Sequence, residues 1–364
     1  VVAPTTGSIG VRTNEFFASM NALSASPTDD ASRADVVAKA GSLAQAFNDA
    51  SAGLTQTRVD LLSRAQSVAG EVNDKLSRIA TLNKAIIEAT SLGNPAADLR
   101  DQRDVLVGDV SDRIGARSIE DKDGSVTVFA AGMTLVERLQ AVTLSVAPDS
   151  TGALKIQATR PGGSATDITA NVTSGTLGGL REARDADIPA VTSRLDQLAN
   201  DIATAVNTVH ATGVGLDGVS GRPLFAPPTG VPGAAATLAV DAAILGHPER
   251  IGASPNVGSL PGGNQVAVQL AQLAGAALGS GTTTPAQRYG SITGDFGITK
   301  ASADSDLQMR RDTVSTAKTL QESASGVSLD EEMVNMTRFQ RAFEASTRVL
   351  KTADELLAGL MQML

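Results

Sequence analysis

The chain has 364 residues, with 30 Lys and Arg against 39 Asp and Glu, and its formal net charge is −9. That balance, without a Lys/Arg-rich run to hold a phosphate backbone, argues against nucleic acid as a partner. The lack of cysteine excludes disulfides and thiolate metal sites, and no stretch approaches the roughly 20 apolar residues that span a bilayer. Aromatic residues make up only 2% of the chain, so Ala, Leu and Val must supply most of a core, as in closely packed helical bundles.

The chain begins with Val1 and shows no basic segment followed by an apolar one, which is the pattern of a cleaved signal peptide. We expect that residue 1 is not the native start, which leaves room for a trimmed export signal.

Helical patterns fill the first part of the chain. A short helix is predicted over residues 15–24, and Pro27 ends it. A second is predicted from Ala31 to about Ser91, because no proline interrupts that stretch; about 60 helical residues would extend about 90 Å, the length of a rod. Its clearest apolar stripe has one polar exception, Lys75, and consists of Leu61, Ala65, Val68, Val72, Ile79, Leu82 and Ile86.

After a turn at residues 92–95 and a return helix over 97–114, the period changes to alternation, which predicts short strands. Asp123-Gly124 predicts a hairpin turn between two of them. The alternating apolar residues are Val126, Val128, Val142, Leu144, Val146, Leu154, Ile156 and Ile168.

A further heptad stripe predicts a helix over residues 186–211. Its members are Ile188, Val191, Leu195, Leu198, Ile202, Ala205 and Val209. Residues 212–265 are rich in Gly and Pro and predict a loop-rich insertion with one strand-like run at 236–244. Helical patterns return at 265–278 and from about 285 to 325.

The last helix carries the clearest signal. Ser328 and Glu331 form a capping box, with the serine at the N-cap and the glutamate three residues later. An apolar seam at heptad spacing follows, and we expect it to be an assembly surface. It consists of Leu329, Met336, Phe339, Phe343, Leu350, Ala353, Leu357, Leu360 and Leu364. The seam requires a facing helix, either in this chain or in a partner.

Patterns that resemble catalytic or binding motifs do not fit their structural contexts. The glycines of residues 213–218 follow a helix rather than a strand, which indicates a loop and not a dinucleotide site. Ser315 and Lys318 fall within a helix and lack the partner motifs of penicillin-interacting enzymes. His210 and His247 stand alone in the sequence. We therefore expect no enzyme, no cofactor and no metal site.

Several stretches resemble flagellar axial proteins, and within that group the hook-associated protein 1 family. The C-terminal ones are residues 326–332 (GVSLDEE), 339–346 (FQRAFEAS) and 352–356 (TADEL). Others are residues 27–30 (PTDD), 43–48 (LAQAFN), 99–104 (LRDQRD), 177–185 (LGGLREARD) and 206–210 (VNTVH). The family's N-terminal helix and its Asn-rich early motif are absent from this sequence.

The resemblance implies a structural adaptor of the bacterial flagellum at the junction between hook and filament. It implies export by the flagellar type III route without a cleaved signal peptide, and an extracellular location. The implied partners are like subunits, hook protein, the second hook–filament junction protein and a cytosolic export chaperone, with no nucleic acid and no membrane insertion. Alternatives are flagellin, the second junction protein, or a secreted binding protein or hydrolase that uses the β-rich insertions.

The expected fold is mainly α with β insertions (α+β), an elongated multi-helix rod or bundle built from both chain ends with one or two β-rich inserted domains. Residues 1–114 and 266–327 are expected to form a discontinuous helical rod domain, with the helix at 186–211 packed on or near it. A β-rich inserted domain is expected at 115–178 and a loop and β-rich insertion at 212–265. Residues 328–364 are expected to form the C-terminal coiled-coil helix.

Overall fold

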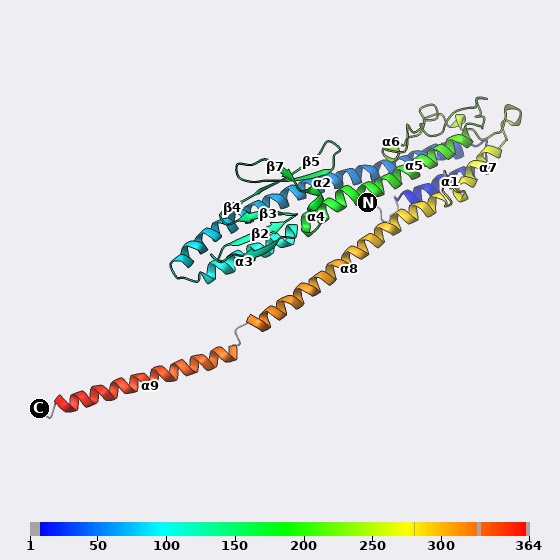
Figure 1. Cartoon of the computed structure of the whole chain (residues 1–364). Helices are drawn as coiled ribbons and strands as arrows, with labels where there is room; N and C mark the ends of the chain where they lie inside the picture. Colours follow the sequence, from blue (N-terminus) through cyan, green and yellow to red (C-terminus); the bar gives the residue numbers. More distant parts are fainter. Residues whose placement is uncertain (1–7, 280, 326–328, 362–364) are drawn as a thin grey trace. The chain divides into compact units, whose positions relative to one another are not determined.

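The computed structural model describes residues 8–279, 281–325 and 329–361 (Figure 1). They fall into two compact units, Val1–Phe296 and Gly297–Leu364. The α-helices are α1 (Ile9–Ala25), α2 (Asp30–Ser91), α3 (Ala97–Ile114), α4 (Gly175–Glu182), α5 (Ile188–His210), α6 (Ala234–Thr237), α7 (Gln265–Gln272), α8 (Pro285–Ser325) and α9 (Leu329–Met361). A π-helical turn, η2 (Ala183–Asp187), joins α4 to α5, and short 3₁₀ turns are η1 (Thr169–Asn171), η3 (Pro248–Arg250), η4 (Val257–Ser259) and η5 (Leu273–Gly275).

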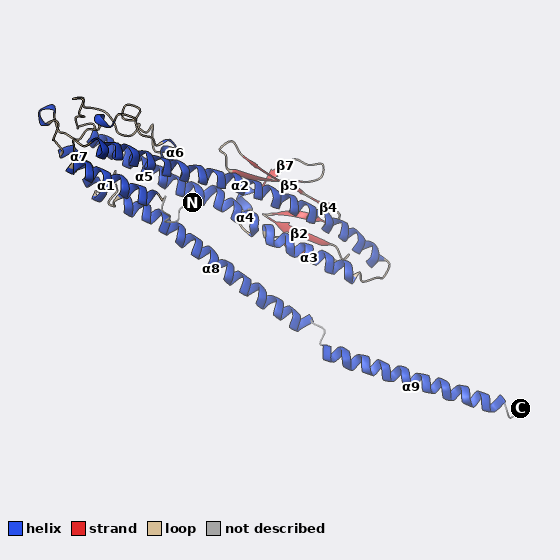
Figure 2. Ribbon diagram, turned by 180° about the vertical axis from the view of Figure 1, so that it is seen from behind, coloured by secondary structure: helices blue, strands red, loops and turns tan. Residues whose placement is uncertain are grey.

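The strands form two small antiparallel sheets in the first unit (Figure 2). One has the order β1-β2-β3-β4 and the other the order β5-β6-β7. Their bounds are β1 (Arg117–Glu120), β2 (Val126–Ala130), β3 (Met133–Glu137), β4 (Gln140–Ala141), β5 (Thr143–Pro148), β6 (Leu154–Thr159) and β7 (Ala165–Asp167). The predicted fold class, mainly α with β insertions, is confirmed.

Helix α2 runs through the whole first unit, and its start is fixed by local chemistry. Asp29 is the N-cap, and its carboxylate accepts hydrogen bonds from the Ser32 backbone N–H at 2.9 Å and from the Ser32 hydroxyl at 2.7 Å. Both bonds lower the pKa of Asp29, and the bond from the hydroxyl has the larger effect. The helix ends before Gly93, whose φ of 82° lies in the left-handed region that glycine adopts freely.

The first of two hydrophobic cores surrounds the N-terminal half of α2. There α1 and α2 pack with α5, α6 and α7. The start of α8 joins this core through the buried side chains of Tyr289 and Ile292. Arg288 forms an ion pair with Asp201 of α5, which fixes the first turns of α8 to the bundle.

The second core surrounds the C-terminal half of α2, together with α3, α4 and the apolar faces of both sheets. Strand β6 alternates between buried and half-buried residues, as its sequence predicts. The predicted turn at Asp123-Gly124 is confirmed: the Gly124 N–H bonds the Asp121 carbonyl at 2.9 Å, and Gly124 has a φ of 84°.

The buried stripe of α2 is offset from the predicted one. Its members are Ala65, Ala69, Val72, Leu76, Ile79, Ala80, Asn83 and Ile86. The buried polar member is therefore Asn83, and the prediction of Lys75 was wrong. Lys75 lies beside the stripe and pairs with Asp109 of α3.

The strand-like run predicted at residues 236–244 was also wrong. Its beginning belongs to α6, and Val240 forms only an isolated bridge with Phe225. The glycine loop at 213–218 follows the end of α5, as predicted, and packs backbone to backbone. A Cβ on Gly213 would lie 2.5 Å from the Gly252 carbonyl oxygen.

Candidate assembly surface

The predicted seam lies on α9, and its described side chains are open to solvent. Met336 is 70% exposed, Phe339 75%, Phe343 74% and Leu350 68%. Three of these positions, Met336, Phe343 and Leu350, are seven residues apart, and Phe339 lies three residues after the first. This spacing places them on one face of the helix.

The other predicted members divide into two groups. Leu329, Glu331, Ala353, Leu357 and Leu360 lie within α9, but their side chains are outside the description. Ser328 and Leu364 lie outside the described residues. The capping box and the end of the seam therefore stay predictions.

The apolar face of α9 is broader than the predicted seam. Val349 is 69% exposed and directly precedes Leu350, and Met333 is 62% exposed one turn before Met336. The predicted seam did not include Val349, because it kept only residues at heptad spacing. A search that also considers the residue directly before each heptad position identifies it. A face this wide is typical of a helix that packs between two neighbours.

Helix α8 adds more exposed apolar surface to the second unit. Leu307, Met309, Val314 and Leu320 are between 46% and 64% exposed. Proteins rarely leave so many large apolar side chains in water unless they mark an interaction surface.

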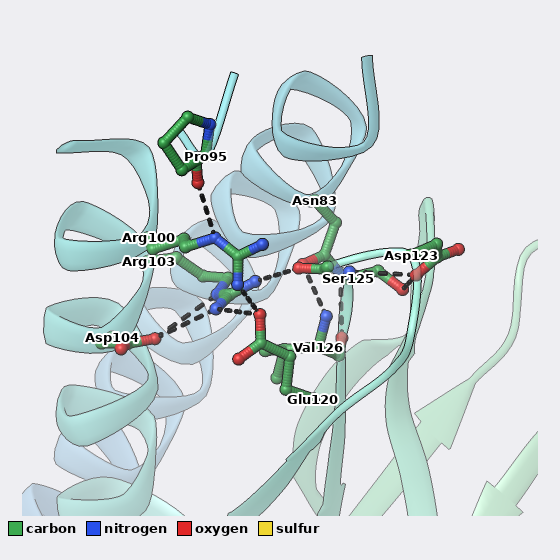
Figure 3. Close-up of polar contacts among 10 residues, drawn as sticks. Asn83, Pro95, Arg100, Arg103, Asp104, Glu120, Asp123, Ser125 and Val126 are labelled. Atoms are coloured by element: carbon green, nitrogen blue, oxygen red, sulfur yellow. Dashed lines mark hydrogen bonds and ion pairs between the residues drawn. The ribbon is translucent and has the colours of Figure 1, made fainter. Parts of the chain in front are cut away.

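Polar side chains of the first unit have a different role, which Figure 3 shows around Arg103. The Arg103 side chain is 2% exposed and donates a 2.7 Å hydrogen bond to the Gly124 carbonyl oxygen. Its guanidinium also lies 3.7 Å from the Glu120 carboxylate, with which Arg100 pairs too. One buried cation thus joins α3 to the β1–β2 turn.

Asn83 of α2 bonds the same hairpin, as Figure 3 also shows. Its carboxamide oxygen accepts from the Val126 N–H at 2.9 Å, and its nitrogen donates to the carbonyls of Val126 and Arg138, both at 2.8 Å. Asn73 bonds Leu144 of β5 in the same way: it accepts from the Leu144 N–H at 2.7 Å and donates to the Leu144 carbonyl at 2.8 Å. Each sheet is therefore fastened to α2 by one asparagine.

The family model described as "Flagellar hook-associated protein FlgK helical domain" matches residues 1–225. The chain belongs to the FlgK family. A second model, "Flagellar basal body rod FlgEFG protein C-terminal", matches residues 321–363, which contain α9. The FlgK family is a structural component of the flagellum at the junction between hook and filament.

Named FlgK relatives agree. Flagellar hook-associated protein 1 of Bacillus subtilis (strain 168) is 28% identical over 379 residues, covering 94% of this chain and 74% of that protein. Flagellar hook-associated protein 1 of Escherichia coli (strain K12) is 27% identical over 232 residues, covering 62% and 42%. The solved flagellar hook junction protein FlgK from Burkholderia pseudomallei has a TM-score of 0.57 and 26% identity, and the match covers 62% of this chain and 42% of that one. The chain thus spans less than half the length of the latter two.

Three side chains from the stretches that resemble the FlgK family hold neighbouring backbone segments. Asn207 accepts from the N–H groups of Leu224 and Phe225, both at 2.9 Å, and thereby holds the loop after α5. Asn48 donates to the carbonyl of Ala235 at 2.9 Å. Arg184 of η2, 7% exposed, donates to the carbonyl of Gly152 at 2.9 Å. These side chains form hydrogen bonds with backbone groups of neighbouring segments and so hold those segments in place.

Ser315 and Lys318, which resemble a catalytic motif in the sequence, lie on the exposed surface of α8. Among the described residues, no group of three or more His, Cys, Asp or Glu side chains is placed to hold a metal ion. Within the same part of the chain, no helix combines the length and apolar character needed to cross a bilayer.

Proposed function

We propose that this FlgK-family chain is an adaptor that joins flagellar hook and filament by burying the apolar face of α9 against neighbouring helices. The observation that carries the proposal is the exposure of Met336, Phe339, Phe343 and Leu350 at heptad spacing. The match of residues 321–363 to the C-terminal model of flagellar rod proteins supports it independently.

The energetics favour assembly through this face. Burying one Leu, Met or Phe side chain contributes about 1.5–3 kcal/mol, so a seam of several such residues outweighs the cost of ordering one helix against another. A strict seven-residue repeat favours a left-handed coiled coil with the facing helix. Because the face is wider than two heptad positions, we infer contacts with two helices rather than one.

The proposed occupants are the flagellar neighbours that the resemblance implies. They are like subunits, hook protein and the second hook–filament junction protein, and the cytosolic export chaperone would cover the same face before export. The proposed location is extracellular, on the flagellum, reached by the type III route without a cleaved signal peptide.

A deletion tests the assignment of assembly to residues 328–364. In a strain that lacks its own copy, the shortened protein should keep the first unit folded, because both hydrophobic cores lie before residue 297. It should fail to join the flagellum and to bind the chaperone. Full filaments in that strain would show that assembly does not need this helix.

Immunogold labelling of the intact protein separates the junction from other axial positions. A junction protein labels one narrow band between hook and filament. Label along the whole filament would instead indicate a filament subunit and contradict the proposed location.

A further inference from the structure

His210, the last residue of α5, is 1% exposed and joins two loop segments that are distant from each other in sequence. Its Nδ1 lies 2.7 Å from the Arg222 carbonyl oxygen, and its Nε2 accepts a 3.0 Å hydrogen bond from the Gly252 N–H. The second bond fixes the tautomer: Nε2 carries no proton, so Nδ1 carries it and donates to Arg222. Both ring nitrogens are therefore used by a neutral imidazole.

A second proton on His210 would break this arrangement. Nε2–H would face the Gly252 N–H, and two donors cannot form a hydrogen bond. The Gly252 backbone packs directly on the end of α5, where a Cβ on Gly252 would lie only 2.8 Å from the His210 carbonyl oxygen, so there is little room to turn the amide away in place. The loop around Gly252 would have to leave the end of α5.

The charges around His210 also oppose protonation. Arg33 of α2 is 1% exposed and donates to the Ile251 carbonyl at 2.9 Å, and Arg222 is the second cation that acts on the ring. Burial lowers the pKa of His210 most; the hydrogen bond to the Arg222 carbonyl raises it, and the charges of Arg222 and Arg33 lower it further. Asp30 faces Arg33.

The carboxylates of the two loops are engaged elsewhere. Asp217 pairs with Arg222 at 2.7 Å, and Glu249 pairs with His247 at 3.0 Å and with Arg250 at 3.7 Å. Burial raises the pKa of Asp217, but the hydrogen bonds from Arg222 and Val219 outweigh it, and the pKa is lowered overall. The pKa of Glu249 is lowered too, mainly by its own backbone N–H. Both stay ionised while a histidine titrates.

We propose that His210 is a pH-sensitive latch that holds the loop 248–254 against the end of α5 and releases it when the ring is protonated. The sign follows from linkage. The native state binds the neutral ring and the released state has an ordinary histidine, so the contact is complete above a pH of about 6.5 and weakens as the pH falls below it.

Hydrogen–deuterium exchange of the whole protein between pH 7.5 and 5, corrected for intrinsic exchange, tests the latch. The opening constant of the Gly252 amide should rise about tenfold per pH unit below about 6.5. The amide of Ile79, buried in the second core, should not follow it. A flat profile at Gly252 would overturn the latch, and so would a parallel rise at Ile79, because the opening would then be global.

Two variants identify the titrating ring. His210→Asn keeps a donor for the Arg222 carbonyl but has no titratable group, so the pH response at Gly252 should disappear. His247→Asn changes the exposed histidine directly before this loop and should leave the response in place. A response that persists in His210→Asn and disappears in His247→Asn would contradict the assignment. If His210→Asn does not fold, the exchange of the Gly252 and Ile79 amides in the unmodified protein still tests the latch.

Discussion

Asparagine side chains on α2 supply hydrogen-bond partners that a neighbouring strand would otherwise provide. Asn73 and Asn83 each bond both the N–H and the carbonyl of one strand residue. A carboxamide suits this task because it has one acceptor and one donor group at the spacing of a peptide. Buried backbone groups without such partners would cost about 1–3 kcal/mol each.

Asn83→Asp tests this account. The carboxylate replaces a donor that faces two carbonyl oxygens, so we expect a loss of about 3 kcal/mol at pH 7 in urea unfolding. Burial raises the pKa of the introduced carboxyl, and its protonated form can donate again, so the loss should shrink at pH 5. Asn73→Asp, at a half-buried position, should cost less. An equal loss at both pH values would contradict the donor role of Asn83.

Arg103→Met removes the cation between α3 and the β1–β2 turn. It leaves the Gly124 carbonyl without its donor, and we expect the free energy of unfolding to fall by about 3 kcal/mol. Arg103→Lys should cost less, because it keeps the charge. Arg78→Met removes an exposed arginine of α2, and its change in the free energy of unfolding should be near zero in the same denaturant titration.

The residue scale is where sequence reasoning is weakest. The predicted apolar stripe of α2 included Leu82 and accepted Lys75 as its one polar exception. The side chains that are buried instead are Leu76 and Asn83. The error arises because Leu76 and Asn83 keep three- and four-residue spacing just as well as their neighbours do. Only the position of the β hairpin decides which face is buried, and periodicity carries no information on that.

At the scale of elements, two adjacent glycines of α4 give a matched pair. A Cβ on Gly178 would lie 2.8 Å from the Thr173 carbonyl carbon, whereas a Cβ on Gly179 would meet nothing within 4 Å. We expect Gly178→Ala to destabilise the first unit by about 1–3 kcal/mol and Gly179→Ala to stabilise it by up to about 1 kcal/mol. Thermal unfolding of both variants measures this, and an equal effect of the two would contradict the close packing of α4.

Long helices were predictable, and irregular segments were not. Helix α2 extends from Asp30 to Ser91, close to the prediction, because no proline interrupts the stretch and Asp29 provides a cap. Residues 236–244 looked like a strand from their apolar side chains, but a strand also needs a paired neighbour, and Val240 has only one bridge. Such pairing is set by tertiary contacts.

At the scale of the whole molecule, the two units differ in how they use apolar side chains. The first unit buries them in two cores. In the second, the described side chains of α8 and α9 are exposed, including Phe339 and Phe343. The sequence could predict the stripe on α9 because heptad spacing is local, but it could not name the helices that cover the stripe, because those belong to other parts of the assembly.

The most direct measurement compares Leu350→Asp with Thr352→Asp in a strain that lacks its own copy, counting filaments per cell. Both positions are exposed on α9, and two residues turn the helix by about 200°, so the same charge falls on the apolar face or away from it. A buried charge at position 350 should abolish filaments, whereas Thr352→Asp should leave their number unchanged. Normal filaments with Leu350→Asp would contradict assembly through this face.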